Sequence, residues 1–410
     1  MQSKLIILIA VILGTVALAQ LVRVYELSAK LRKNAEHEVP NRDNVMNARF
    51  MLVFMLFQFF GLIYLMLKYG WTGRGEAASI EGVETDWLLN LNFVIILIGF
   101  FLTNFLLFYF SFKYVRKPGV KAYYYPHNNK LEMIWTIIPA IVLAAIIILG
   151  LKSWNKLTAI SGDDAVRIEL FAKQYDWTAR YAGADNILGR HDYKLTTADS
   201  NELALVTSKT IDASIRIMLE GPSGIEDIQR LLNNRDTVLN DSTMNAKRVE
   251  LSRKERLLRL LFQMKGNHAK GLDKTAWDDI IQKDTLFLCV NQPYEFNIRA
   301  MDVLHSAYFP HFRAQMNAVP GMTTRTKFTP ILTTQQMRTK MNDPKFNFIL
   351  LCNKICGAAH FGMKMIIVVK DKKSFDAWMK QKSKETFGAK YLPSVEAKAK
   401  APVVVAPANM

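Results

Sequence analysis

The residues best suited to chemistry in this chain lie in one short loop. Cys352, Cys356, His360 and Met363 follow a Cys-x₃-Cys-x₃-His-x₂-Met pattern within the segment LCNKICGAAHFGMKM. Thiolate, imidazole and thioether form the soft donor set that favours copper. Gly357 directly follows the second cysteine and permits a tight turn of the backbone. The loop is therefore predicted to bind a metal.

A metal in this loop needs a further ligand from elsewhere, and His305 is the best candidate. It follows closely on a predicted strand, in the segment MDVLHS. The remaining histidines are expected to be surface residues rather than ligands: His37, His127, His191, His268 and His311. Of these, His311 lies nearest to His305 in the chain.

Three interpretations of these residues remain open. A disulfide between Cys352 and Cys356 would leave His360 and Met363 without a role. Zinc could bind both cysteines with His305 and His360, again without Met363. A mononuclear blue-copper site needs one cysteine. Two copper ions sharing both thiolates, with one terminal histidine each, would form a compact core that takes up an electron with little rearrangement. This interpretation uses all five residues and is favoured.

Composition indicates how such a loop is presented. The chain has 410 residues, is 50% hydrophobic and carries a net charge of +17, which is typical of a membrane protein with Lys/Arg-rich loops. No nucleic-acid-binding pattern accompanies the basic residues, so no nucleic-acid partner is expected. The third cysteine, Cys289, is predicted to be a buried free thiol in a strand.

Four apolar runs are long enough to cross a bilayer, which needs roughly 20 residues: Leu5–Val22, Phe50–Leu67, Leu91–Phe112 and Met133–Leu151.

The linkers between these runs alternate in charge. The first and third are rich in Lys and Arg, whereas the second carries mainly acids. The positive-inside rule then places the N-terminus and everything after Leu151 outside. A cleaved signal peptide, Met1–Ala19, is the alternative for the first run. It would put the metal loop in the cytoplasm, against the charge pattern. Glu132, at the start of the last run, is either an interfacial carboxylate or the mouth of a proton path.

The outer half changes from long apolar runs to short β-prone ones. These predict an antiparallel sandwich or barrel with a site on its loops. The series of β-prone runs is interrupted at about Gly221–Asp284. This segment is predicted to be helical, with helices Ile225–Leu232 and Asn245–Met264. It is either a solvated hairpin or a docking surface. A short helix, Phe375–Lys382, is predicted after the N-cap Ser374, and the tail after Pro393 is expected to be disordered. The predicted strands are Val166–Phe171, Leu203–Ser208, Ser214–Leu219, Thr285–Val290, Glu295–Ala300, Thr326–Leu332, Phe346–Leu351 and Met365–Val369.

Together these residues resemble subunit II of the haem-copper cytochrome c oxidases, over roughly Leu91–Lys380 apart from the helical insertion. Three segments carry the likeness: the span hairpin containing LEMIWTIIP, the pair DVLHS and MNAVPG, and the loop Cys352–Met363. The resemblance implies a cupredoxin-like Greek-key barrel or sandwich behind membrane helices. It divides the chain into two additional spans with a basic linker (1–68), a transmembrane hairpin (69–152), an extracytoplasmic domain (153–393) with a helical insertion (221–284), and a tail (394–410).

The resemblance also implies a function. Electrons from a c-type cytochrome would enter at a binuclear copper centre, CuA, and pass to haem a in subunit I, where oxygen is reduced to water with proton pumping. Haem a and CuB would lie in subunit I; subunit III is a further expected partner. Glu132 would open the proton path. The location implied is a bacterial-type inner membrane, with the CuA domain on the periplasmic face. The implied copper ligands are His305, Cys352, the Lys354 backbone carbonyl, Cys356, His360 and Met363.

Several positions depart from the family pattern. Lys354 replaces a glutamate that helps to hold magnesium, which puts a magnesium site in doubt. Asn317 also replaces an acid, so a less basic or tethered donor is expected. The family's aromatic Gln-Trp-Tyr-Trp reads QYDW here, which makes Tyr175 and Trp177 candidates for electron entry. Trp177 is equally well explained as a packing residue.

Two other classes of protein remain as alternatives. Another CuA-bearing reductase would need a second, histidine-rich copper cluster, which seven scattered histidines do not supply. A membrane copper-delivery protein would use sparse, exposed ligands rather than convergent ones. The chain has no Cys-x-x-Cys-His motif, so no fused c-type haem is expected.

Overall fold

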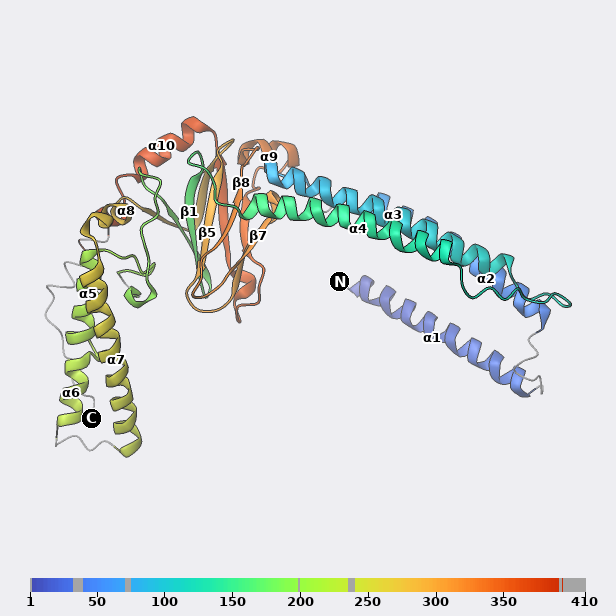
Figure 1. The fold of residues 1–410 in the computed structure, drawn as a ribbon, viewed down its shortest axis with the longest axis horizontal. Coiled ribbons are helices and arrows are strands. Elements are labelled where there is room, and N and C mark those ends of the chain that lie inside the picture. The colour runs from blue at the N-terminus through green and yellow to red at the C-terminus, as the bar shows by residue number, and fades with distance from the viewer. Residues whose placement is uncertain are drawn as a thin grey trace. The chain divides into compact units, whose positions relative to one another are not determined.

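The computed structural model describes residues 2–31, 40–70, 75–197, 200–234, 240–390 and 393 (Figure 1). The chain forms two compact units. One combines Met1–Gly75 with Leu91–Leu143, and the other combines Glu76–Asn90 with Ala144–Met410. His37 lies outside the described residues, and so does the predicted tail after Pro393.

The first unit is made of long apolar helices. They are α1 (Gln2–Leu31), α2 (Asn41–Leu65) with the π-helical turn η1 (Met66–Gly70), and parts of α3 (Ile80–Lys113) and α4 (Asn129–Thr158), whose remaining residues belong to the second unit. Among the described residues, four stretches are long and apolar enough to cross a membrane: Ile9–Ser28, Asn41–Gly70, Ile80–Lys113 and Asn129–Thr158. The four predicted spans are thus confirmed as apolar helices, and the third and fourth continue well past the predicted limits. α4 also runs through Pro139 without a break.

Aromatic side chains join α2 to α3. Phe54 packs edge-on against Phe108 at 5.6 Å, and Phe59 against Phe101 at 4.7 Å between ring centroids. Many other large apolar side chains on these helices remain exposed. Apolar surface on this scale is unfavourable in water. It suits lipid tails or the apolar faces of other chains.

The second unit contains two five-stranded sheets. One has the order β3-β2-β1-β5-β8 and the other β4-β10-β9-β6-β7. The strands are β1 (Val166–Lys173), β2 (Asp176–Tyr181), β3 (Ile280–Lys283), β4 (Thr285–Cys289), β5 (Tyr294–Ala300), β6 (His305–Phe309), β7 (Ala314–Ala318), β8 (Thr324–Phe328), β9 (Phe348–Cys352) and β10 (Lys364–Lys370). Aromatic rings fill the core, among them Phe312 stacked on Phe328 at 4.6 Å. The predicted sandwich is confirmed; the sheets are open and do not close into a barrel.

Most strand pairs are antiparallel, as predicted, but two pairs are parallel. β1 pairs with β5 in parallel, and so does β4 with β10. Parallel neighbours need a long crossover connection. More than a hundred residues separate β1 from β5, and this stretch contains the helical region, so the chain has ample length to return in the same direction.

Two predicted strands, Leu203–Ser208 and Ser214–Leu219, were also wrong. The second lies within helix α5 (Ser208–Glu220), and the first leads into it. Thr207 caps this helix by accepting a hydrogen bond from the Thr210 backbone N–H. Ile211 and Ile215, one helical turn apart, both face the interior. The capping threonine and this spacing outweigh the short apolar alternation around Arg216.

The helical region is therefore longer than predicted. It comprises α5, α6 (Ile225–Asn233), α7 (Asp241–Asn267) and α8 (Lys274–Trp277), with the 3₁₀ turn η3 (Lys270–Asp273) before α8. Leu261 of α7 packs with Ile211 and Ile215 of α5. The two predicted helices of the insertion, Ile225–Leu232 and Asn245–Met264, are confirmed as α6 and α7. The terminal helix, α10 (Lys372–Lys382), is also confirmed, but Asp371 rather than Ser374 caps it, accepting from the Ser374 backbone N–H at 2.9 Å.

The first turns of α3 are built into the two-sheet unit. Ser79 donates its hydroxyl proton to the carbonyl of Phe312 at 2.8 Å, and Arg313 holds Asp86 with two nitrogen–oxygen contacts of 3.0 and 3.2 Å. A side chain at Gly82 would lie only 2.9 Å from the Phe312 carbonyl oxygen. This close approach requires glycine, and it fixes the start of the helix on the sheet unit.

Candidate metal centre

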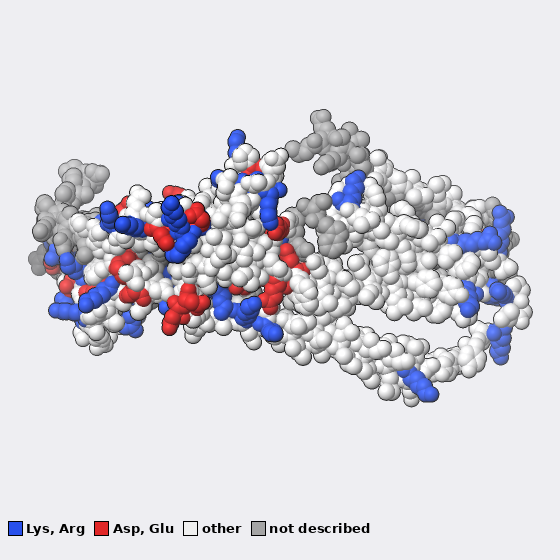
Figure 2. Space-filling view, turned by 90° about the horizontal axis from the view of Figure 1, so that it is seen from above, with Lys and Arg blue, Asp and Glu red and all other residues white. Residues whose placement is uncertain are grey.

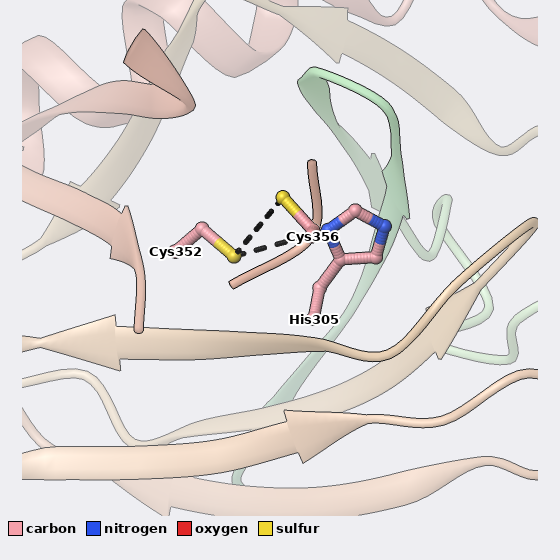
Figure 3. Close-up of side chains that lie close together, drawn as sticks. All are labelled: His305, Cys352 and Cys356. Carbon is pink, nitrogen blue, oxygen red and sulfur yellow. Dashed lines mark hydrogen bonds between the residues drawn. The ribbon is translucent and has the colours of Figure 1, made fainter. Parts of the chain in front are cut away.

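Two free thiols form the middle of the site (Figure 3). Cys352 is the last residue of β9, and Cys356 lies in the loop that follows it. Their sulfur atoms are 3.9 Å apart. A disulfide bond measures about 2.05 Å, so these are two separate sulfur donors facing one another. Cys289 is likewise a buried free thiol in β4, as predicted.

His305 reaches the same point from the neighbouring strand. It begins β6 and is fully buried. Its Nε2 donates to an Asp302 carboxylate oxygen at 2.8 Å, and its Nδ1 lies 3.8 Å from the Cys352 sulfur. A hydrogen bond of this kind fixes the ring orientation and the tautomer, and leaves the other nitrogen free to ligate. β6 pairs with β9, which brings the two residues together.

The remaining predicted donors surround the two sulfurs. Nδ1 of His360 lies 3.5 Å, and the Met363 sulfur 3.8 Å, from the Cys356 sulfur. The Lys354 carbonyl oxygen lies 3.3 Å from the Cys352 sulfur. The Cys352 backbone N–H donates to the Met363 carbonyl at 3.1 Å and closes the base of the loop. All six predicted donor groups are therefore brought to one place.

The electrostatics of the site favour the neutral thiol of Cys356 unless a cation is bound. Burial raises the pKa of the Cys356 thiol to about 11, and the neighbouring Cys352 sulfur adds to this rise. Two thiolates this close repel each other unless a positive charge lies between them. A soft metal ion supplies that charge and displaces the thiol protons on binding. The donor set of thiols, imidazoles and a thioether fits copper.

Tyr175 and Trp177, the two candidates for electron entry, also come to the site. Trp177 is fully buried, and its indole lies edge to face with the His305 ring at 6.3 Å between centroids. Tyr175 is partly exposed and its hydroxyl accepts from the Ala358 backbone N–H. Two supporting residues were missed as site residues from sequence, Asp302 and Gln174. The spacing of an acid three residues before His305 was a usable signal for Asp302.

Other candidates lie elsewhere. Glu132 is in the first turn of α4, half-exposed, and accepts a hydrogen bond from the Asn128 backbone N–H at 3.2 Å. His311 is not a surface residue as expected; it is half-buried against Phe346 and Phe348, and burial lowers its pKa. His268 is buried too.

The physical reason for the burial of His268 is a specific partner. Its Nε2 meets the Asp273 carboxylate at 2.5 Å, just after α7 ends. Within the described part of the chain, one group of His, Cys, Asp or Glu side chains is arranged to hold a metal ion: His305, Cys352 and Cys356.

The fold and the site together define a class of protein, in which a metal site with two thiols lies on a two-sheet unit in a chain that also carries long apolar helices. Comparison with known proteins narrows it. Residues 69–153 match the family model for the transmembrane domain of cytochrome c oxidase subunit II. The chain is 27% identical over 323 residues to the alternative cytochrome c oxidase subunit 2 of Bradyrhizobium diazoefficiens, covering 78% of this chain and 86% of that protein.

A second relative is cytochrome c oxidase subunit 2 of Corynebacterium glutamicum, 24% identical over 322 residues, covering 77% of this chain and 76% of that protein. Among solved structures, the periplasmic domain of subunit II of cytochrome oxidase (CoxB) of Bradyrhizobium japonicum matches 55% of this chain and 99% of that domain. It does so with 16% identity and a TM-score of 0.27, which is too low to add to the argument.

The chain is a relative of cytochrome c oxidase subunit II, as the resemblance in its motifs predicted. The similar proteins are named as subunits of an oxidase, and four helices in the described part of this chain are long and apolar enough to cross a membrane. The cluster of His305, Cys352 and Cys356 is arranged to hold a metal ion.

Proposed function

We propose that this chain is the electron-entry subunit of a respiratory cytochrome c oxidase and holds a binuclear CuA centre. The observation that carries the proposal is the convergence of four further donor groups on two cysteine sulfurs 3.9 Å apart. When bound, the copper pair would accept and release single electrons. The proposed ligands are His305, Cys352, the Lys354 carbonyl, Cys356, His360 and Met363.

The protein's contribution is a preformed cage in which four of the six proposed ligand residues are buried, whereas His360 is half-buried and Lys354 is exposed. His305, Cys352, Cys356 and Met363 are all buried. Their donors are held by the β6–β9 pairing and by the closed base of the loop. A rigid site of this kind changes little between oxidation states, and exclusion of water removes solvent rearrangement from the electron transfer.

The proposed partners follow from the family. A c-type cytochrome would donate electrons, and haem a in subunit I would receive them, with CuB also in subunit I and subunit III alongside. Glu132 would form the entrance of a proton path into subunit I. The two-sheet unit would lie on the periplasmic face of a bacterial inner membrane, where the linker charges place it.

Lys354 distinguishes this chain from the family pattern. Its side chain is exposed, and an ammonium group cannot ligate magnesium. We propose that it supplies in place the positive charge that magnesium supplies elsewhere. Metal analysis of the purified oxidase should then find no stoichiometric magnesium bound at this position; its presence there would contradict the proposal.

The electron donor is proposed to be less basic than usual, or tethered to the oxidase. The acid at position 302 remains near the site, but both of its carboxylate oxygens already accept hydrogen bonds, from Gln174, Val303 and His305. Turnover should therefore depend weakly on salt. A steep decline with ionic strength, as for a freely diffusing basic donor, would argue against it.

The central test uses the purified oxidase containing the full chain. Copper content and electron paramagnetic resonance should reveal two copper ions sharing one delocalised unpaired electron. Cys356→Ser should abolish that signal. Cys289→Ser is the matched control, because Cys289 is also buried and free but lies away from the site in β4. A single localised copper, or zinc in its place, would refute the proposed centre.

A further inference from the structure

The two ligand segments of the metal site are far apart in the chain, and a third segment touches both. This is the corner between β1 and β2, formed by Gln174 and Tyr175. We infer that this corner is a clamp that sets the position of Cys356 relative to Cys352 and His305. The inference rests on the proposed CuA function and assigns these two residues a positioning role.

The corner forms hydrogen bonds with two nearby backbone groups of the metal loop. Gln174 donates its side-chain amide proton to the carbonyl of Cys356, and the Tyr175 hydroxyl accepts from the Ala358 backbone N–H at 3.1 Å. A tryptophan at position 175 could not accept this bond, since its ring nitrogen only donates. The phenol thus gives this chain a contact that an indole cannot make.

Gly357, between these two contacts, shows how closely the loop is seated on the corner. A Cβ there would lie 2.3 Å from the Tyr175 hydroxyl oxygen and 2.9 Å from the Gln174 amide nitrogen. Its φ of +139° is also a conformation that favours glycine. The loop backbone therefore rests directly on both side chains.

The same corner also holds the segment that carries His305. The Gln174 backbone N–H donates to one Asp302 carboxylate oxygen at 2.7 Å, and the other oxygen accepts from Nε2 of His305. The carboxylate thus links the corner to the imidazole that faces Cys352. One two-residue turn contacts both halves of the site.

The two cysteines differ in what fixes them. Cys352 ends β9 and is placed by the sheet, through pairing with β6. Within the described residues, the hydrogen bonds from the backbone of residues 354–358 to groups outside the loop go to Gln174 and Tyr175. Sheet pairing therefore positions one sulfur, and the clamp positions the other.

The test introduces Tyr175→Phe into the chain and studies the purified oxidase. Gln174→Leu, which removes the other contact, is expected to act in the same direction. Tyr175→Phe removes only the accepting oxygen and keeps the ring, so the fold is expected to persist. Copper release to a chelator should be about fivefold faster, the ratio that corresponds to one lost hydrogen bond of about 1 kcal/mol. The copper hyperfine pattern and the reduction potential of the site should shift, whereas an unrelated fold-stabilising role would leave both unchanged.

Tyr193→Phe is the matched control, because Tyr193 is an exposed tyrosine in the 3₁₀ turn η2 (Tyr193–Leu195), where it contacts Lys194. A measurement that does not depend on bound metal is hydrogen exchange of the backbone amides in the peptide containing Ala358. The exchange should be faster in Tyr175→Phe and unchanged in Tyr193→Phe. Unchanged copper release, hyperfine pattern and amide exchange in Tyr175→Phe would overturn the clamp. If the wild-type oxidase shows no two-copper signal, the proposed function fails instead, and faster amide exchange at Ala358 would still support the clamp.

Discussion

The indole of Trp177 occupies a buried position directly beside a proposed copper ligand. It packs edge to face with His305, and its Nε1 has no hydrogen-bond partner among the described residues. An unpaired buried N–H is a cost that packing alone does not explain. The contact with His305 and the unpaired Nε1 are the two observations on which we propose a relay role for Trp177.

Replacing this indole provides a test at the scale of one residue. Trp177→Phe should slow donor-driven turnover severalfold while copper content stays unchanged, because the smaller ring lies farther from His305. Trp378→Phe is the matched control; Trp378 is also a buried indole, but it packs against Tyr181 and Phe287. Steady-state turnover with a c-type cytochrome is the measurement. Unchanged turnover in Trp177→Phe would leave only the packing role.

At the scale of elements, a buried ion network joins the helical region to the sheet. Arg180 of β2 contacts Glu169 of β1 and Asp279, which directly precedes β3. Arg299 of β5 contacts the other oxygen of Glu169 at 2.6 Å. Burial by itself raises the pKa of Glu169, but the two guanidinium groups outweigh it and lower that pKa to about 2. The network therefore keeps Glu169 charged in the interior, whereas burial raises the pKa of Asp279 to about 7.

Removing the central arginine should be strongly destabilising. Arg180→Met leaves Asp279 without its guanidinium and Glu169 with only Arg299, and an uncompensated buried charge costs about 3–5 kcal/mol. Arg230→Met is the control, since Arg230 forms an exposed pair with Asp227 of the same helix, and such pairs contribute about 0–1 kcal/mol. Unfolding midpoints of the purified chains compare the two. Equal losses would contradict this assignment.

His191, at the edge of this network, should make stability depend on pH. Burial lowers its pKa to about 4, assisted by Arg299 and Arg180 and opposed by Glu169 and Asp192. Its ordinary value is 6.5, so between these pH values the unfolded chain takes up a proton that the folded chain does not. Folded stability is therefore lost as pH falls from 6.5 towards 4.

Replacing His191 isolates this effect from other titrating groups. His191→Gln should become more stable relative to wild type as pH is lowered through that range, by on the order of 1–2 kcal/mol. The full linkage of about 1.4 kcal/mol per pH unit is reduced because a third of the imidazole is exposed. Thermal midpoints of both proteins across pH provide the measurement. A difference that does not vary with pH would disprove it.

At the scale of the whole molecule, charge and apolar surface are separated along the chain. Figure 2 shows charged residues of both signs mixed over the two-sheet unit, whereas the long helices are almost uncharged along their lengths. The linker between α3 and α4 carries Lys117 and Lys121 without an acid. Basic linkers of this kind stay on the cytoplasmic side.

Reporter fusions test this membrane arrangement. Alkaline phosphatase, which is active only outside the cytoplasm, should be inactive when fused after Gly119 in the basic linker. It should be active after Gly75 and after Thr158, because both positions are predicted to lie outside. An active reporter after Gly119, with inactive reporters at the other two positions, would show that the topology is the reverse of the predicted one. That result would favour the cleaved signal peptide.

Local features of this protein were determined by the sequence alone. The spacing of Cys352, Cys356, His360 and Met363 predicted a single loop site, because neighbouring residues cannot lie far apart. The four apolar helices followed from run length, since a bilayer imposes a minimum length on any span. Helices α6 and α7 of the insertion followed from their apolar spacing, whereas α8 was not predicted and part of α5, Ser214–Leu219, was predicted as a strand.

What depends on distant contacts was decided only by the tertiary structure. The parallel β1–β5 and β4–β10 pairs join segments that no local pattern relates. The buried partners of Arg180 come from separate strands and the end of the insertion. The same holds for the clamp: nothing in the order of residues shows that Gln174 and Tyr175 reach Cys356, since hydrogen bonds across 182 positions arise only when the whole sandwich closes.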